Sequence, residues 1–177
     1  MSVASSLVAV QPAFAEAHNS QDVSQKIEKL SQGLVGRIGV AAQEIGSDKV
    51  IAVNGDETFA MASAYKIAIA AKVMDRVDKG ELSLDQMVDV PPDMYVAGTV
   101  AIAERFPYPG VKFSLANLIY PMNTESDNTA TDVLMGLAGG PAAVTENLRR
   151  LGITDFRVDR TVREILMDFY SLPVVTP

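Results

Sequence analysis

Ser63 and Lys66 are the residues whose types and spacing first suggest chemistry. They are three positions apart, so on a helix both side chains lie on one face and can meet. Backbone N–H groups at a helix N-terminus favour negative charge near a serine, and desolvation lowers the pKa of a lysine in an apolar helix. Such a lysine can act as a base toward the neighbouring hydroxyl. The alternative is structural, a serine cap beside a lysine at a solvated edge, because a Ser-x-x-Lys match is common by chance.

An apolar run around these two residues predicts the helix that would position them. Ala, Ile, Val and Met dominate from 64 to 74, and neither Gly nor Pro follows until Gly80. This composition and length favour a mostly buried helix rather than a strand. We expect the helix to begin near Ser63, to continue to about Asp78 and to end with Gly80 as its C′ residue.

The order of the other predicted elements indicates an α+β protein. In chain order they are a helix over 23–32, a hairpin with strands over 36–45 and 49–54, the helix that begins near Ser63, a mainly loop segment over 91–112, and helices over 115–120, 128–137, 141–151 and 161–170. A hairpin of two strands is not stable alone, so we expect further strands or a helix to lie across it.

Composition excludes several classes of function. The 177 residues are 48% apolar and 21% charged, which is ordinary for a soluble globular domain. A formal charge of −7 without a basic cluster argues against nucleic-acid binding. Cysteine is absent, which excludes a thiol nucleophile and cysteine-ligated zinc, and the single histidine, His18, leaves a serine–histidine triad without a plausible base. We expect no cofactor, no metal and no stable membrane span.

The N-terminus resembles the end of a signal peptide. Residues 2–10 are small and apolar, and Ala13-x-Ala15 before Glu16 looks like a signal-peptidase site. A basic region in front of the apolar run is missing, so the true start is expected upstream. We therefore expect residues 1–15 to be the remnant of a signal peptide and the protein to be periplasmic or secreted by a bacterium. The alternative is a disordered apolar N-terminus.

A second polar cluster, Ser126-Asp127-Asn128, lies in the loop between two predicted helices. Taken alone, it would be a solvated helix cap. Together with Ser63-x-x-Lys66 it resembles the motif pair of class A β-lactamases and penicillin-binding proteins. The surroundings are similar as well, with Gly139-Gly140-Pro141 leading into the next helix and Asp159-Arg160 where the family's omega loop starts. The resemblance covers about 27–166, most of the chain.

The resemblance implies a β-lactamase/transpeptidase-like fold and a serine hydrolase that acts on β-lactams. Ser63 would attack the strained lactam carbonyl, and Lys66 would hold and pass its proton. Ser126 would relay a proton to the departing ring nitrogen, and Asn128 would hydrogen-bond the substrate's side-chain amide. The Ser63 backbone N–H would supply half of an oxyanion hole. Tyr95 either lines the cleft or is a packed loop tyrosine.

The omega loop departs from the family's pattern. Counting from Asp159-Arg160, Val162 stands where the family has its deacylating glutamate, and Leu166 where it has a water-holding asparagine. Valine cannot take a proton from water, so an acyl-enzyme would form and persist. Glu164, two places further on, is a candidate base if the register shifts. Asp132 also replaces an asparagine that the family uses to steady the loop.

The other departure is the end of the sequence. It stops at Pro177 without the Lys-Thr-Gly or Lys-Ser-Gly motif that supplies the family's second oxyanion donor and a cation for the substrate carboxylate. We therefore expect residues 16–177 to form a partial, C-terminally truncated β-lactamase-like catalytic domain without its last sheet strands.

Three functions stay open. The first is a class A β-lactamase-like enzyme that β-lactams acylate at Ser63 and that hydrolyses the product slowly. The second is a penicillin-binding, D-Ala-D-Ala peptidase-like protein acting on a peptidoglycan-like peptide, for which a missing deacylating acid is less surprising. The third is a truncated, non-catalytic remnant.

Overall fold

The chain folds as two compact units, which comprise residues Met1–Ala60 and Met61–Pro177. The computed structural model describes residues 20–108 and 110–170. The predicted signal-peptide remnant at 1–15 lies outside the described residues. Among the helices that are described, none combines the length and the hydropathy needed to cross a membrane.

The first unit is a helix packed on a β-hairpin. Helix α1 (Ser20–Ser31) contacts β2 (Val50–Val53), which pairs antiparallel with β1 (Val40–Gln43). Gly46 lies in the turn at a φ of 82°, a left-handed conformation that glycine adopts without strain. The predicted hairpin is confirmed, with strands shorter than the sequence pattern indicates.

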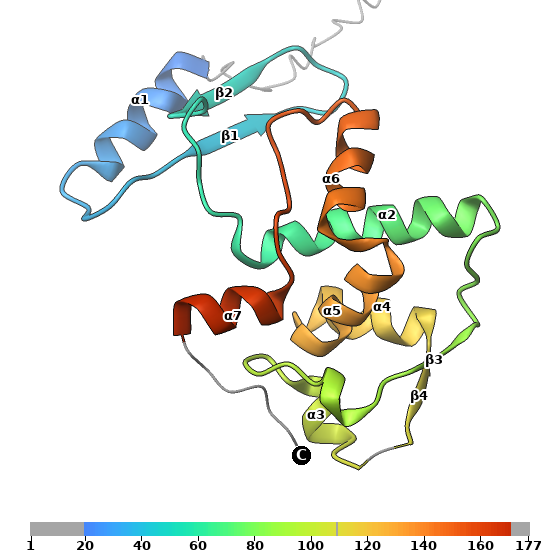
Figure 1. Ribbon diagram of the computed structural model, residues 1–177. Coiled ribbons are helices and arrows are strands. Elements are labelled where there is room, and N and C mark those ends of the chain that lie inside the picture. The colour runs from blue at the N-terminus through green and yellow to red at the C-terminus, as the bar shows by residue number, and fades with distance from the viewer. Residues whose placement is uncertain (1–19, 109, 171–177) are drawn as a thin grey trace, which may run out of the picture. The chain divides into compact units, whose positions relative to one another are not determined.

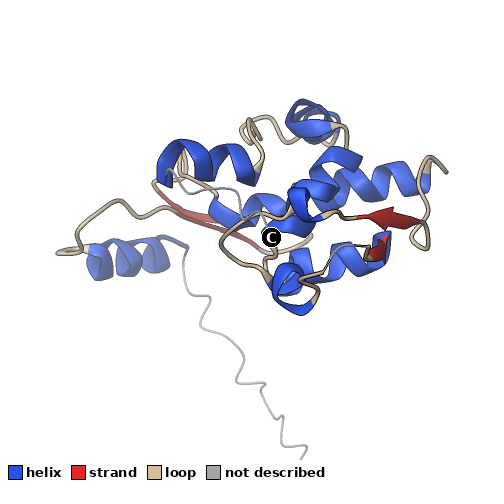
Figure 2. Cartoon of the chain, turned by 60° about the horizontal axis from the view of Figure 1, so that its bottom comes forward, coloured by secondary structure: helices blue, strands red, loops and turns tan. Residues whose placement is uncertain are grey.

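The second unit is mainly helical, with short strands (Figures 1 and 2). Its elements are η1 (Ala62–Tyr65), α2 (Lys66–Asp78), β3 (Met87–Asp89), η2 (Pro92–Met94), α3 (Ala101–Arg105), β4 (Lys112–Ser114), α4 (Leu115–Thr124), α5 (Asn128–Leu137), α6 (Gly140–Arg150) and α7 (Val162–Tyr170). A hairpin in the first unit and helices in the second agree with the predicted α+β order.

Helix α2 lies at the centre of the second unit's core. Ile69 and Val73, one helical turn apart, are completely buried. They belong to one hydrophobic cluster with residues of α4, α5 and α6, and each of these helices contacts α2 (Figure 1). The opposing helices contribute fully buried side chains of their own, among them Leu118, Leu134 and Val144. Because burial of each such side chain stabilises the fold by about 1.5–3 kcal/mol, α2 has one well-defined position within this unit.

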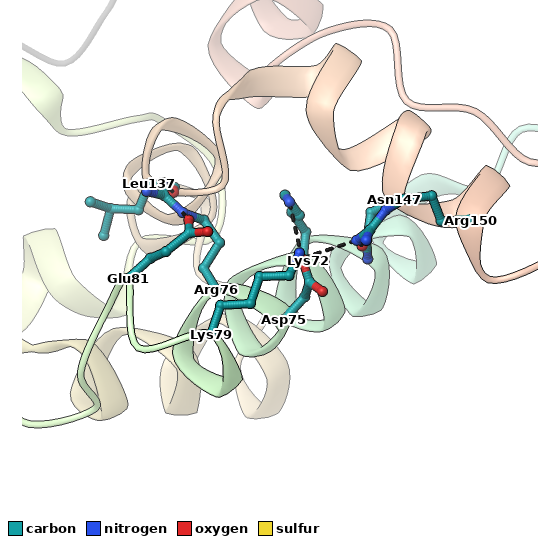
Figure 3. Close-up of polar contacts among 8 residues, drawn as sticks. All are labelled: Lys72, Asp75, Arg76, Lys79, Glu81, Leu137, Asn147 and Arg150. Atoms are coloured by element: carbon teal, nitrogen blue, oxygen red, sulfur yellow. Dashed lines mark hydrogen bonds and ion pairs between the residues drawn. The ribbon is translucent and has the colours of Figure 1, made fainter.

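A charged network joins the later part of α2 to α6 (Figure 3). The Asp75 carboxylate accepts hydrogen bonds from Lys79 at 2.8 Å, Arg150 at 3.0 Å and Lys72 at 3.1 Å. Arg150 also donates to the side chain of Asn147, which is buried. The hydrogen bond from Lys79, together with those from Lys72 and Arg150, holds the pKa of Asp75 well below its usual range. This network links α2 to α6 at the end of α2 opposite Lys66.

The prediction of a mainly loop segment over 91–112 is wrong in part. The segment contains η2 and α3, and strands β3 and β4 pair beside it with Val88 opposite Phe113. Three-residue strands are too short to show the alternation that marks a strand in the sequence. Their pairing joins positions 25 apart, so only the folded chain reveals it.

The helix predicted over 115–120 is longer in the structure than the sequence indicates. Helix α4 continues through Pro121 to Thr124, although proline cannot donate a backbone hydrogen bond. Pro121 is buried, and its carbonyl accepts hydrogen bonds from the amides of Glu125 at 3.0 Å and Asp127 at 3.1 Å. The helix thus accommodates the proline, whose ring is buried in the core of this unit and whose carbonyl binds the residues that follow the helix.

Candidate active site

Ser63 and Lys66 lie at the start of the central helix, as the apolar run predicts. Ser63 is an exposed residue of η1, and Lys66 is the first residue of α2, with only 3% of its surface exposed. The capping positions before η1 and α2 are Met61 and Tyr65, and neither side chain makes a capping hydrogen bond. The structural alternative, a serine cap beside a solvated lysine, is therefore wrong for both residues.

The ammonium group of Lys66 is held by three oxygen atoms. Its Nζ donates to the Ser126 carbonyl at 2.6 Å, to Ser126 Oγ at 2.9 Å and to Asn128 Oδ1 at 3.1 Å. These acceptors match the three donors of an ammonium group. Burial lowers the pKa of Lys66, while the charges of Asp127 and Asp132 oppose that shift. The two motifs, about 60 residues apart, therefore meet in one cluster.

The loop that carries Ser126 is fixed from both sides. Ser126 has a φ of 57°, a left-handed conformation that is uncommon for residues other than glycine and that costs energy. The next residue, Asp127, is fully buried and caps α5 by accepting a hydrogen bond from the Ala130 amide at 2.6 Å. Its other carboxylate oxygen accepts from the Ile102 amide at 2.8 Å. Both contacts hold Ser126 against Lys66.

The side-chain amide of Asn128 has a fixed orientation. Its Nδ2 donates to the Ala97 carbonyl at 2.8 Å, so its Oδ1 faces Lys66. Its backbone amide donates to the Thr99 carbonyl at 2.9 Å. A Cβ atom at Gly98, which has a φ of 100°, would lie 2.6 Å from Asn128 Nδ2. Only glycine allows this close approach of the chain to Asn128.

The hydroxyl of Ser63 takes no part in this cluster. Within the described part of the chain it makes no hydrogen bond, and Lys66 is held by Ser126 and Asn128 instead. Ser63 is exposed, which leaves its hydroxyl accessible to a ligand. Hydrogen bonds between catalytic groups are often long before a substrate binds, so this geometry does not argue against a nucleophilic role.

Two other candidate residues have structural contacts. Tyr95 is 2% exposed, and its hydroxyl donates to the Phe106 carbonyl at 2.6 Å, which agrees with a packed loop tyrosine and not with a residue that lines the cleft. Glu164 forms a capping box with Thr161, whose amide and hydroxyl both donate to the Glu164 carboxylate. These hydrogen bonds lower the pKa of Glu164 and make it a weaker base.

Asp132 joins α5 to the first turn of α7. Its two carboxylate oxygens accept hydrogen bonds from the backbone amides of Val162 at 2.8 Å and Arg163 at 2.9 Å. Burial raises the pKa of Asp132, and the two backbone hydrogen bonds oppose that shift. Val162 is 8% exposed and offers only an apolar side chain. Asp132 thus holds the first turn of α7 on α5, and Val162, which we expect at the family's glutamate position, lies directly at this attachment.

Sequence reasoning did not single out Gly98 and Thr129. Thr129 is fully buried, and its Oγ1 accepts a hydrogen bond from the Val96 amide at 3.0 Å. Its place directly after Asn128 is a usable signal, whereas Gly98 lies in a stretch without any regular pattern.

Comparisons with known proteins identify the family. A family model described as the beta-lactamase enzyme family matches residues 22–172. The chain is 31% identical to beta-lactamase SME-1 of Serratia marcescens over 85% of its own length and 51% of that protein. It is 34% identical to beta-lactamase Toho-2 of Escherichia coli over 78% of its own length and 47% of that protein.

Solved structures agree with this assignment. A beta-lactamase from Chitinophaga pinensis has a TM-score of 0.76 at 27% identity, covering 86% of this chain and 55% of its own. An ancestral class A beta-lactamase has a TM-score of 0.75 at 34% identity, covering 81% of this chain and 54% of its own. The fold is therefore that of the class A β-lactamase-like hydrolases.

The chain belongs to the beta-lactamase enzyme family. The predicted family and fold class are confirmed. The chain spans about half the length of the relatives that it matches.

Proposed function

We propose that this protein is a serine hydrolase that β-lactams acylate at Ser63 and that releases the acyl group slowly. The observation that carries this proposal is the buried Lys66, held within 3.1 Å of Ser126 and Asn128 and three residues from an exposed serine. Relatives named as beta-lactamases support the substrate class. We further propose that the protein is exported to the periplasm or secreted.

The acylation step requires Lys66 in its neutral form, which its burial favours. Ser63 Oγ attacks the lactam carbonyl carbon and gives its proton to Lys66 Nζ. Lys66 passes a proton to Ser126 Oγ, 2.9 Å away, and Ser126 gives its own proton to the ring nitrogen. The carbon–nitrogen bond breaks, and an ester of Ser63 remains. The proton lost by the serine thus ends on the opened ring's nitrogen.

The remaining groups bind and polarise the substrate. The Ser63 backbone N–H supplies one donor to the developing oxyanion, an interaction typically worth about 3 kcal/mol. Asn128 lies at the same cluster and hydrogen-bonds the substrate's side-chain amide. A β-lactam carries both the strained carbonyl and this amide, which makes it the proposed small-molecule partner.

Slow deacylation follows from the start of α7. Val162 has no group that accepts a proton from water, and the Glu164 carboxylate is engaged with Thr161. A water molecule near the ester would therefore lack a general base. A general base typically raises the rate of such a step by about 10²–10⁴-fold, so deacylation is slow without one. We leave Glu164 and Tyr95 out of the proposed catalytic set because of their structural contacts.

The proposal is tested by mass spectrometry of the protein expressed from its complete gene after exposure to benzylpenicillin. We expect a covalent adduct of one penicillin, located on Ser63 by peptide mapping and stable for minutes or longer. Ser63→Ala is the matched control and should remain unmodified. An unmodified wild-type protein, with its fold verified by circular dichroism, would refute the proposal.

A penicillin-binding peptidase is the second candidate function. It is favoured by the apolar Val162 at the glutamate position, because a peptidase of this type does not need to hydrolyse penicilloyl esters quickly. Turnover of a D-Ala-D-Ala peptide exceeding that of nitrocefin would favour the peptidase. If Ser63→Ala changed neither activity nor labelling, the third interpretation, a non-catalytic remnant, would stand.

A further inference from the structure

The 93–102 segment connects the Ser126–Asn128 loop to α7. On the side of α5 it is held by four hydrogen bonds: from the Val96 amide to Thr129 Oγ1 at 3.0 Å, from Asn128 Nδ2 to the Ala97 carbonyl at 2.8 Å, from the Asn128 amide to the Thr99 carbonyl at 2.9 Å, and from the Ile102 amide to Asp127 Oδ2 at 2.8 Å. Three consecutive residues, the α5 cap Asp127 and the first two residues of α5, therefore determine where this segment lies.

Arg163 holds the same segment from the other side. Its Nη2 donates to the Asp93 carbonyl at 2.7 Å and more weakly to the Tyr95 carbonyl at 3.4 Å. Its backbone amide donates to Asp132 Oδ2 at 2.9 Å, which ties it to α5. A closed ring of contacts therefore runs from α5 through Asp132 to Arg163, through the 93–102 segment, and back to α5 at Asn128.

The ring determines which end of the Asn128 amide faces Lys66. The Ala97 carbonyl accepts only from the NH₂ group, so the oxygen of the amide is turned toward Lys66 Nζ. If the Ala97 carbonyl were displaced, the NH₂ group would lose its acceptor, and only the contact with Lys66 would then orient the amide. Ala97 lies two residues after Tyr95, whose carbonyl is bound by Arg163.

We propose that Arg163 is a positioning residue for the cluster of Lys66, Ser126 and Asn128. It holds the start of the 93–102 segment in place, so that Ala97 orients the Asn128 amide and Asn128 Oδ1 remains an acceptor for Lys66. The guanidinium group suits this role because one of its nitrogens, Nη2, carries two N–H donors and contacts both carbonyls. The consequence for acylation rests on the proposed function, whereas the structural role does not.

The structural role is tested by residue-resolved amide exchange in the wild type, Arg163→Ala and Arg157→Ala. Arg157 is an exposed arginine that pairs with Asp159 at 2.9 Å, so it is a matched control for loss of a surface charge. Loss of an anchoring hydrogen bond should speed exchange of the Val96 amide and the Asn128 side-chain NH₂ group by about tenfold in Arg163→Ala. Amides within α2 should not change. Unchanged exchange at these groups would overturn the proposal.

The effect on chemistry is tested with a fluorescent penicillin. In Arg163→Ala we expect the second-order rate constant for labelling to fall by about tenfold, while the labelled fraction at saturation stays the same. Arg163→Lys, which keeps a cationic donor group on a shorter side chain, should recover part of the rate and secures the test if the alanine variant folds poorly. A loss of labelled fraction at an unchanged rate constant would mean that Arg163 only keeps the protein folded and does not position the cluster, which would overturn the proposal. If the wild type were not labelled, the proposed function would be refuted. The exchange measurement would then be the only test of whether Arg163 positions the cluster.

Discussion

Lys66 is the residue on which the proposed chemistry depends. Burial disfavours its charged form, yet it lies against three oxygen acceptors and near the charges of Asp127 and Asp132. Burial thus favours the neutral form of Lys66, the form that the proposed proton transfer from Ser63 requires. Ser126, which binds Lys66 through both its carbonyl and its hydroxyl, has a left-handed backbone conformation. The strained backbone therefore coincides with a residue of the proposed site.

Val162→Glu is the substitution that we expect to change the fate of the acyl-enzyme. It places a carboxylate at the start of α7. Asp132 holds this position through the Val162 backbone amide, so the substitution leaves that hydrogen bond in place. A base there should raise the deacylation rate by about 10²-fold, measured as release of the penicilloyl adduct over time. Val162→Gln, of the same size without a basic group, is the control. An equal rate in both variants would contradict the role of the missing acid.

Tyr65→Phe tests a buried hydroxyl beside the site. Tyr65 Oη is buried and has no hydrogen-bond partner within the described part of the chain, and burial followed by the charge of Asp132 raises its pKa. Burying an unpaired hydroxyl is unfavourable, so removing it should raise the free energy of unfolding by about 1 kcal/mol. Urea unfolding measures the change, with Tyr120→Phe at an exposed tyrosine as control. A clear loss of stability in Tyr65→Phe would contradict this account.

At the scale of elements, two attachments determine where α2 lies within the second unit. The apolar face of α2 packs on α4, α5 and α6, and the Asp75 network in Figure 3 joins its later part to α6. Asp132 attaches α7 to α5 by accepting hydrogen bonds from two backbone amides in the first turn of α7. The residues of the proposed site are therefore carried by α2 and α5, and apolar packing together with polar contacts fixes the position of these helices within the second unit.

Asp75→Asn tests the network through the pH dependence of stability. The pKa of Asp75 is lowered in the folded protein, so its contribution is fully present above the unfolded value of about 3.9 and is lost as pH falls below it. We expect the variant to unfold at a lower temperature than the wild type between pH 5 and 8. The difference should shrink between about pH 4 and pH 2. Thermal melts across this range provide the measurement, and a difference independent of pH would contradict the expectation.

At the scale of the whole molecule, the two units differ in how much apolar surface they bury. In the described part of the first unit only Val53 is a buried hydrophobic residue, whereas the second unit contains a continuous core around α2. Backbone amides of α1, β1 and β2 should therefore exchange with solvent at least about a hundredfold faster than those in the middle of α2 and α5. Peptide-resolved exchange of the native protein measures both sets at once. Equal protection would show that the first unit is stabilised by something beyond its own contacts.

The sequence by itself determined the local elements and the identity of the motifs. Helix α5 begins at Asn128 and ends at Leu137 as predicted, because a capping residue and two glycines mark its ends in the sequence. The hairpin and the apolar helix after Ser63 are likewise set by neighbouring residues. The Ser-x-x-Lys and Ser-Asp-Asn motifs were recognised from the sequence because a motif is defined by its residue types and their order.

Only the tertiary structure decided what those residues touch. That Lys66 is bound by a loop 60 positions away, that Asn128 presents its oxygen to Lys66, and that Glu164 is engaged in a helix cap are results of packing. The 91–112 segment is held by hydrogen bonds to α5 and α7, so its own sequence shows little of the periodicity that marks a helix or a strand. Contacts between distant parts of a chain depend on how every intervening element packs, and no local run of residues encodes them.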